Sequence, residues 1–167
     1  MPDQATIQRA RQDEREGKTP STQAGEFVRE EMDHIREGKH GARSTKQAIA
    51  IGLSKARRAG VKLPPPKKGT TSAKTRKAAK RASAAGRAAT KKRPSAKRSR
   101  ATTKALRREG RGAASKSALS KQAKSAARKR SAASRSASAR KASRTKGPRE
   151  RSAAARKAAR TRARKRR

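Results

Sequence analysis

Large hydrophobic residues recur with helical spacing in the first part of the chain. One stripe, at intervals of four, four and three residues, comprises Ala24, Val28, Met32 and Ile35, with Phe27 at its edge. This spacing places the side chains on one face of an α-helix. Thr19 followed by Pro20 suits an N-cap and a first helical position, and Gly38 suits a C-terminal stop. The pattern predicts a helix between these two ends.

A second helical stripe follows the loop GKHGAR. It comprises Ala48, Ile49, Gly52, Leu53 and Ala56. Ser44 and Gln47 form an S-x-x-Q capping box at its start, and Gly60 ends it. Small residues at 48, 52 and 56 allow a neighbouring helix to approach closely. We therefore expect the two helices to form a helical hairpin domain over residues 19–63.

The segments on either side of the hairpin contain few large apolar residues. Residues 1–18 are expected to form a short, loosely attached helix because Ile7 is their one large apolar anchor. Residues 64–70 have the composition of a Pro/Lys linker, and residues 71–167 form a low-complexity basic tail rich in Lys, Arg, Ala and Ser. The predicted fold class is all-α, with a small hairpin on the N-terminal side. The remainder is expected to be intrinsically disordered, or helical only when bound, without a packed core.

The hairpin has few residues with which to stabilise itself. About ten large side chains, at roughly 1.5–3 kcal/mol for each one fully buried, barely offset the entropy of ordering about forty residues. Ile51 points away from the apolar stripe, so it packs on Leu63 or Ile7, or marks a surface for a partner. We expect a hairpin that is marginal alone and firmer with a protein partner or in self-association.

Charged residues, like large hydrophobic residues, are distributed unevenly between the two parts of the chain. The 167 residues include 52 Lys+Arg and 11 Asp+Glu, a formal net charge of +41. Residues 1–63 carry +4 and residues 64–167 carry +37, with Glu109 and Glu150 as the acids of the second part. A polyanion is the expected partner, because each neutralised phosphate releases counterions. One Phe and no Tyr or Trp disfavour base stacking on single strands, which leaves duplex DNA or structured RNA.

Candidate phosphate contacts lie in the C-terminal part, where each basic residue is replaceable by another. They are Arg128, Lys129, Arg130, Arg140, Lys141, Arg156, Lys157, Arg160, Arg162, Arg164, Lys165, Arg166 and Arg167. A possible anion site at the start of the second helix comprises Lys39, Arg43 and Ser44, because free amides and the helix dipole favour an anion there. The alternative is a capped helix after a basic loop.

No enzyme, cofactor or metal is expected. The run GKHGARST does not fit the phosphate-binding pattern G-x-x-x-x-G-K-[ST]. His34 and His40 are predicted to lie in a helix and a loop without convergent carboxylates, and the chain has no Cys. Membrane insertion is not expected, because no apolar run approaches the roughly 18 residues of a span. We expect a cytoplasmic, nucleoid-associated protein.

The stretch 26–63, with KQAIAIGLSKAR at 46–57 as its most specific part, resembles a small bacterial domain family of unknown function. The resemblance implies a bacterial protein and carries no activity. The basic tail resembles linker-histone tails and bacterial histone-like proteins in composition. Together these features predict a histone-like protein that binds DNA without sequence specificity. The alternatives are an adaptor whose hairpin docks a protein partner, and an RNA- or ribosome-associated protein.

Overall fold

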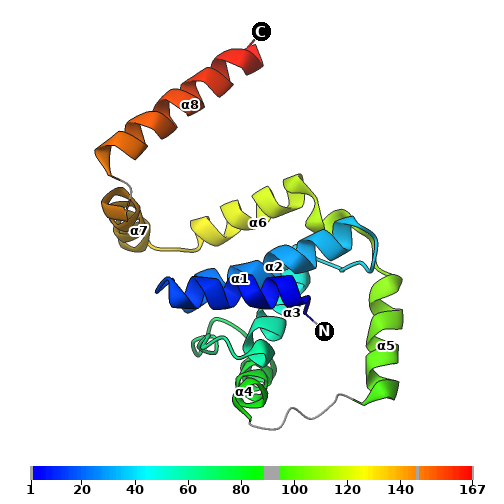
Figure 1. The fold of residues 1–167 in the computed structure, drawn as a ribbon. Coiled ribbons are helices and arrows are strands. Elements are labelled where there is room, and N and C mark those ends of the chain that lie inside the picture. The colour runs from blue at the N-terminus through cyan, green and yellow to red at the C-terminus, as the bar shows by residue number, and fades with distance from the viewer. Residues whose placement is uncertain (1, 89–94, 146, 167) are drawn as a thin grey trace. The chain divides into compact units, whose positions relative to one another are not determined.

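The computed structural model describes residues 2–88, 95–145 and 147–166, in which the elements are helical (Figure 1). The helices are α1 (Gln4–Arg15), α2 (Pro20–Arg36), α3 (Thr45–Ala59), α4 (Ala73–Arg87), α5 (Ala96–Arg107), η1 (Gly112–Ala114, a 3₁₀ helix), α6 (Lys116–Arg128), α7 (Ala132–Thr145) and α8 (Pro148–Arg166). The chain divides into two compact units, residues 1–122 and 123–167.

The two predicted helices of the hairpin begin and end at the residues that the sequence indicates. Helix α2 begins with Pro20 at its first position. The Ser44 hydroxyl caps α3 by accepting a hydrogen bond from the Gln47 amide at 3.2 Å, and the Gln47 side chain accepts from the Arg43 amide at 2.9 Å. Gly60 ends α3 with a φ of 105°, a left-handed conformation that favours glycine.

Gly52 allows α2 and α3 to pack closely. A Cβ added at this position would lie 2.7 Å from the Cα of Val28 and 3.0 Å from the carbonyl oxygen of Phe27. Ala48 and Ala56, one turn to either side, are fully buried. The stripe of small residues is therefore the surface on which α3 meets the backbone of α2.

The core of the first unit consists of two small hydrophobic clusters. One contains Met32, Ile35, Ala42, Ala48 and Ala114, with Val28, Ile49, Ala113 and Leu119 packed against it. The other contains Ala10, Ala24, Phe27 and Ala56, with Ile7, Leu53, Ala59, Val61 and Leu63 packed against it. Ile51 is half-buried and belongs to neither cluster. Both clusters extend beyond the hairpin, since α1 contributes to one and the region of η1 to the other.

The prediction that the remainder of the chain is disordered, or helical only when bound, and lacks a packed core is wrong. Residues 73–87 form α4, which packs on α3 and buries Ala79 and Ala82. The packing is close, because a Cβ on Gly86 would lie 2.0 Å from the carbonyl oxygen of Arg57. Farther along, Ala114 is fully buried and Leu119 packs beside it. The prediction failed because it considered large apolar residues only, whereas most of these contacts use alanine and glycine.

The segment around η1 is also fastened to the hairpin by hydrogen bonds. The Thr45 hydroxyl donates to the carbonyl of Ala113 at 2.7 Å, and the Arg36 guanidinium donates to that of Ala114 at 3.1 Å. Within the loop between α2 and α3, the amides of Gly41 and Ala42 donate to carbonyls of residues 106 and 110. Backbone groups at the loop end of the hairpin are thereby paired with the last turn of α5 and with the chain that follows it.

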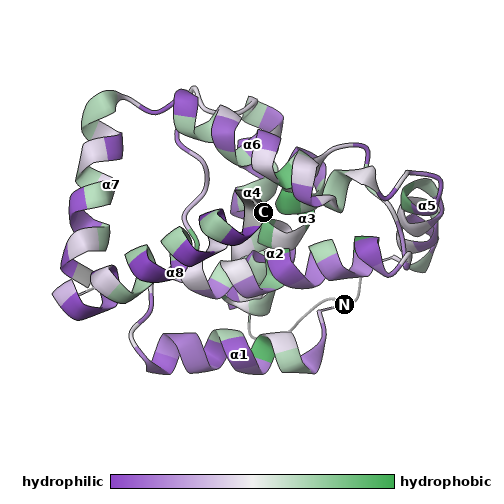
Figure 2. Cartoon of the chain, turned by 90° about the horizontal axis from the view of Figure 1, so that it is seen from above, coloured by the Kyte–Doolittle hydropathy of each residue, from purple (hydrophilic) through white to green (hydrophobic). Residues whose placement is uncertain are grey.

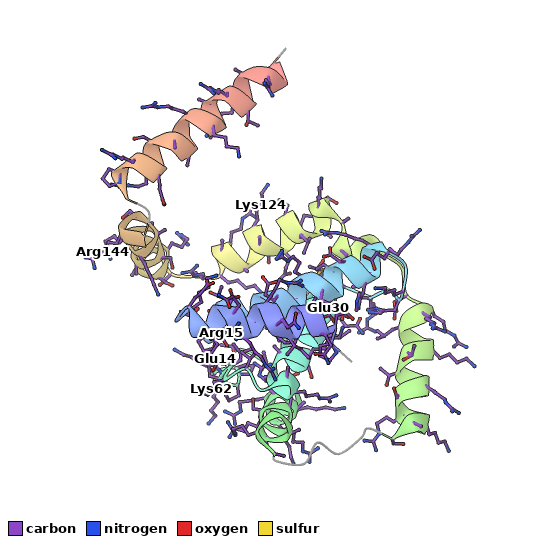
Figure 3. All side chains as sticks on the ribbon, in the orientation of Figure 1. Glu14, Arg15, Glu30, Lys62, Lys124 and Arg144 are labelled. Carbon is purple, nitrogen blue, oxygen red and sulfur yellow. The ribbon has the colours of Figure 1, made fainter. Side chains whose placement is uncertain are left out.

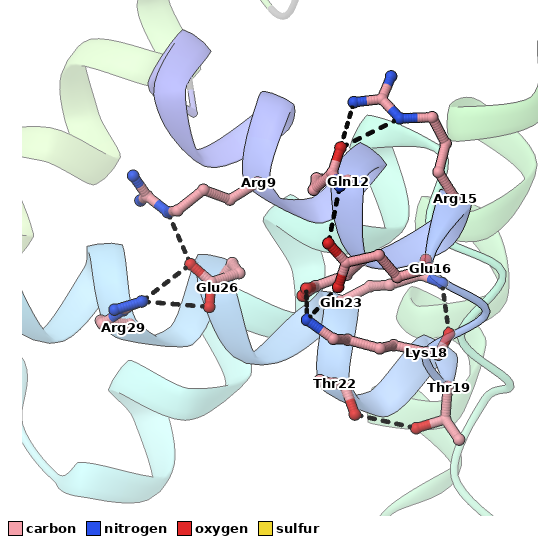
Figure 4. A network of polar contacts seen from close by, with 11 residues as sticks. Arg9, Gln12, Arg15, Glu16, Lys18, Thr19, Thr22, Gln23, Glu26 and Arg29 are labelled. Atoms are coloured by element: carbon pink, nitrogen blue, oxygen red, sulfur yellow. Dashed lines mark hydrogen bonds and ion pairs between the residues drawn. The ribbon is translucent and has the colours of Figure 1, made fainter.

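Helix α1 lies along α2 and is joined to it by a network of charged and polar side chains (Figure 4). Arg9 pairs with Glu26 of α2 at 2.7 Å. Lys18, in the connection, pairs with Asp13 at 2.8 Å and with Glu16 at 2.7 Å, and these carboxylates raise the pKa of the lysine. Thr6 and Ala10 are buried, so α1 also has one face that is shielded from solvent. How loosely α1 is held stays a prediction.

The second unit has a different character. Its described side chains, from Ala123 to Arg164, are all exposed. In Figure 2, α7 and α8 carry purple and pale segments mixed along their length, because alanine is their most hydrophobic residue. Among the described helices of the whole chain, none combines the length and the apolarity that crossing a membrane requires.

Candidate nucleic-acid interface

The predicted phosphate contacts lie on or beside helices of the second unit. Arg128 ends α6, and Lys129 and Arg130 lie in the connection to α7. Arg140 and Lys141 belong to α7, and α8 carries Arg156, Lys157, Arg160, Arg162 and Arg164. All of these side chains are exposed. The side chains of Lys165 and Arg166, and the whole of Arg167, lie outside the described residues.

Of the seven cations of α8 whose side chains are described, most lie on one face. With 3.6 residues per turn, a face about 100° wide holds five of them. They are Arg149, Arg156, Lys157, Arg160 and Arg164. Arg151 and Arg162 fall on the opposite side of the helix. The face, named here the α8 basic face, runs over about 22 Å at 1.5 Å per residue, and its members share one strip of surface.

Helix α7 carries a smaller basic face and a local hydrogen-bond network. Arg140, Lys141 and Arg144 lie on one side of the helix by the same helical geometry. Arg130 is already engaged within the unit, since its guanidinium donates to the carbonyl of Ser134 at 3.0 Å and to the Ser138 hydroxyl. Arg130 must therefore exchange these partners if it binds a phosphate.

The first unit contributes basic helices that the predicted contact residues omit. On α4, Lys77, Lys80 and Arg81 lie opposite the small residues that pack on α3, and all three are exposed. On α5, the exposed cations are Lys97, Arg98, Arg100, Lys104 and Arg107. The signal for α4 was present in the sequence as Ala79, Ala82 and Gly86, a helical spacing of small residues.

Apart from Glu109, the acidic residues of the first unit lie in its N-terminal part and form ion pairs there. Each ion pair between described residues of this unit joins partners that lie between positions 3 and 62. Figure 3 shows one such pair, in which Lys62 lies beside Glu14 at 3.7 Å. Residues 64–122 hold 20 Lys+Arg and one acid, Glu109. The cations of α4 and α5 thus take no part in these ion pairs, which neutralise the acidic residues of the N-terminal part.

At the possible anion site of Lys39, Arg43 and Ser44, three polar groups already have partners within the chain. The Ser44 hydroxyl and the Arg43 amide both bond to Gln47, as the capped-helix alternative expects. Lys39 pairs with Glu37 at 2.9 Å, and this carboxylate raises the pKa of the lysine. Anion binding at this position stays a prediction.

A buried polar cluster lies between α2 and α3. Glu30 and Glu31 have side chains 3% and 0% exposed, and Lys55 reaches both, at 2.9 Å and 2.8 Å. Burial raises the pKa of Glu30, but hydrogen bonds from Lys55, the Asp3 amide and Thr6 outweigh it, so the pKa is lowered overall. Burial likewise lowers the pKa of Lys55, and its two carboxylate partners more than reverse this effect.

Both histidines join this cluster, contrary to the expectation that no carboxylate converges on them. The Nε2 atom of His34 lies 3.2 Å from the Asp3 carboxylate, and that of His40 lies 3.5 Å from Glu31. Sequence spacing alone could not place Asp3 or the loop residue His40 beside α2. The cluster brings together groups able to hold a cation, with Glu31, His34 and His40 as one set and Asp3, Glu30 and His34 as another.

Comparison with known proteins identifies one segment of the chain. Neither the curated proteins nor the solved structures contain a match. The predicted resemblance of residues 26–63 to a family of unknown function is confirmed with wider bounds, which include all of α2 and α3. Residues 17–68 match the family of unknown function DUF6496.

Proposed function

We propose that this protein binds duplex DNA through the phosphate backbone, without sequence preference, as a histone-like component of the bacterial nucleoid. The observation that supports this function best is the separation of charge. Residues 64–167 hold 39 Lys+Arg against two acids, and the described cations of α7 and α8 are exposed. Such a density of positive charge exceeds what solubility requires, and it complements a polyphosphate.

Helical presentation of the cations explains how they act together. The α8 basic face extends over about 22 Å, a length in which duplex DNA carries about 13 charges. Arginine suits this role because its planar fork bonds phosphate oxygens in pairs. Release of counterions from the neutralised phosphates then supplies most of the binding free energy.

The aromatic content favours a duplex over a single strand. Phe27 is the one aromatic residue of the chain, and it is fully buried between the hairpin helices. Recognition of single strands relies on exposed aromatic rings that stack on the bases. The apolar faces of the hairpin are covered by α1, α4 and η1, which makes an adaptor role for this surface the weaker proposal.

The test measures binding of the full chain to two unrelated duplexes of equal length. Fluorescence anisotropy monitors both titrations in the same buffer. The expected result is near-equal affinity, because phosphate contacts carry no sequence information. A preference of about 1,000-fold or more for one duplex would indicate specific recognition and contradict the proposal. Displacement of both duplexes by a far smaller amount of structured ribosomal RNA would assign the protein to RNA instead.

A further inference from the structure

We infer that Glu31, His34 and His40 form a binding site for a divalent transition-metal ion, with Zn²⁺ as the ion of choice. Glu31 and His34 lie three positions apart on α2, so they project from one side of the helix. His40 joins them from the loop before α3. One donor atom from each residue lies within 4.8 Å of the other two.

One oxygen of the Glu31 carboxylate in this cluster has no hydrogen-bond partner. The side chain is fully buried, and its Oε1 atom makes no hydrogen bond. Its other oxygen lies 2.8 Å from the ammonium of Lys55. Facing Oε1 at 3.5 Å is the Nε2 atom of His40. A buried carboxylate oxygen in this state requires a cation or a proton donor.

The hydrogen bond made by the His40 ring determines whether its Nε2 atom presents a proton or a lone pair to that oxygen. Its Nδ1 atom lies 3.1 Å from the carbonyl oxygen of Gly41, which can only accept, so Nδ1 carries the proton. In a neutral ring, Nε2 then presents a lone pair to the carboxylate, and two acceptors face each other. A carbonyl bonded to the far nitrogen is the usual way in which a protein orients a metal-binding histidine.

The separation of two of the donors also suits a metal. Tetrahedral Zn²⁺ with bonds of about 2.0–2.1 Å holds its ligand atoms about 3.3–3.5 Å apart. The 3.5 Å between Glu31 and His40 is close to this separation. Two imidazoles and one carboxylate leave a fourth position for water or for Asp3, whose carboxylate lies 3.2 Å from His34.

Charge and access favour the ion as well. With neutral imidazoles, Asp3, Glu30, Glu31 and Lys55 together carry two negative charges, which a dication would balance. The side chains of His34 and His40 are 13% and 17% exposed, so two of the three donor residues contact solvent. An ion held here would fasten α2 to the loop that bonds the chain after α5.

The experiment is calorimetric titration of the chelator-treated full chain with ZnCl₂. The expected result is saturable binding of a single ion, weakened about 100-fold or more by His34→Ala and by His40→Ala. Glu37→Gln is the matched control, because Glu37 is a nearby acid that is exposed and paired with Lys39, and its removal should leave the affinity unchanged. Equal binding by all three variants would mean an adventitious ion and would overturn the inference.

A second measurement covers the case in which a variant fails to fold. In the unmodified chain, nitrogen NMR of the two histidine rings distinguishes metal ligation from protonation. The inference predicts that Zn²⁺ shifts a ring nitrogen of both His34 and His40. If both rings are protonated near neutral pH and Zn²⁺ leaves them unchanged, a proton satisfies Glu31 and the metal site is refuted.

Discussion

Lys55 maintains the charge balance inside the hairpin. Its side chain is 19% exposed and reaches two acids that have almost no contact with solvent, Glu30 and Glu31 (Figure 3 labels Glu30). Removing charged groups from water costs free energy that only close opposite charges and hydrogen bonds recover. The three residues therefore act as one unit, and loss of the shared cation affects both carboxylates.

Replacement of Lys55 tests this dependence. We expect Lys55→Met to lower the free energy of unfolding by about 3–5 kcal/mol, because it leaves buried carboxylates without their cation. Urea denaturation near neutral pH measures the change. The matched control is Lys62→Met, which removes an exposed pair and should cost about 1 kcal/mol or less. Similar losses in the two variants would contradict the assigned role of Lys55.

The lowered pKa of Glu30 predicts how stability depends on pH. In the unfolded chain a glutamate titrates near pH 4.3, which is about its ordinary value. The stability that Glu30 contributes is thus fully present above about pH 4.3 and disappears as the pH falls through its folded value. Urea midpoints measured across this acidic range should fall less steeply for Glu30→Gln than for the unmodified chain. Identical slopes would show that Glu30 does not contribute.

At the level of elements, glycine and alanine determine which helices pack. Gly52 brings α3 onto α2, and Gly86 brings α4 onto α3, each at a distance that a Cβ would prevent. The sequence predicted the first contact because large residues flank Gly52. It did not predict the second, because Ala79, Ala82 and Gly86 occur in a segment whose composition resembles that of disordered chains.

Two glycine substitutions distinguish close packing from helix propensity. Gly52→Ala should lower the free energy of unfolding by about 1–3 kcal/mol, since its Cβ would meet the backbone of Val28. Gly25 lies in α2 with open space around it, so Gly25→Ala should raise stability by about 0.5–1 kcal/mol. Thermal unfolding of the two variants provides the comparison. A stabilised Gly52→Ala protein would contradict the packing of α3 on α2.

The α8 basic face leads to a prediction about how this helix binds DNA. Arg156→Gln with Arg160→Gln removes two charges from this face, whereas Arg151→Gln with Arg162→Gln removes two from the opposite side. If α8 binds DNA through its basic face, the first pair should reduce the slope of log affinity against log salt by about 1.8, and the second pair by less. Equal reductions would mean that the helix does not bind in one orientation.

For the whole molecule, charge and structure divide the chain at different places. The charge changes after residue 63, but the first unit extends to residue 122, because α4 and η1 complete the core of the hairpin. Composition predicted the polyanion partner, but the tertiary contacts that join basic segments to the hairpin could not be deduced from it. The candidate cation cluster likewise depends on contacts between distant residues.

The dependence of DNA affinity on salt tests the central claim most directly. The full chain is titrated with one duplex over a series of salt concentrations, and log affinity is plotted against log salt. Engagement of about ten phosphates predicts a straight line with a slope near −9. A slope near zero, or no binding in dilute buffer, would show that the basic helices do not act on phosphates.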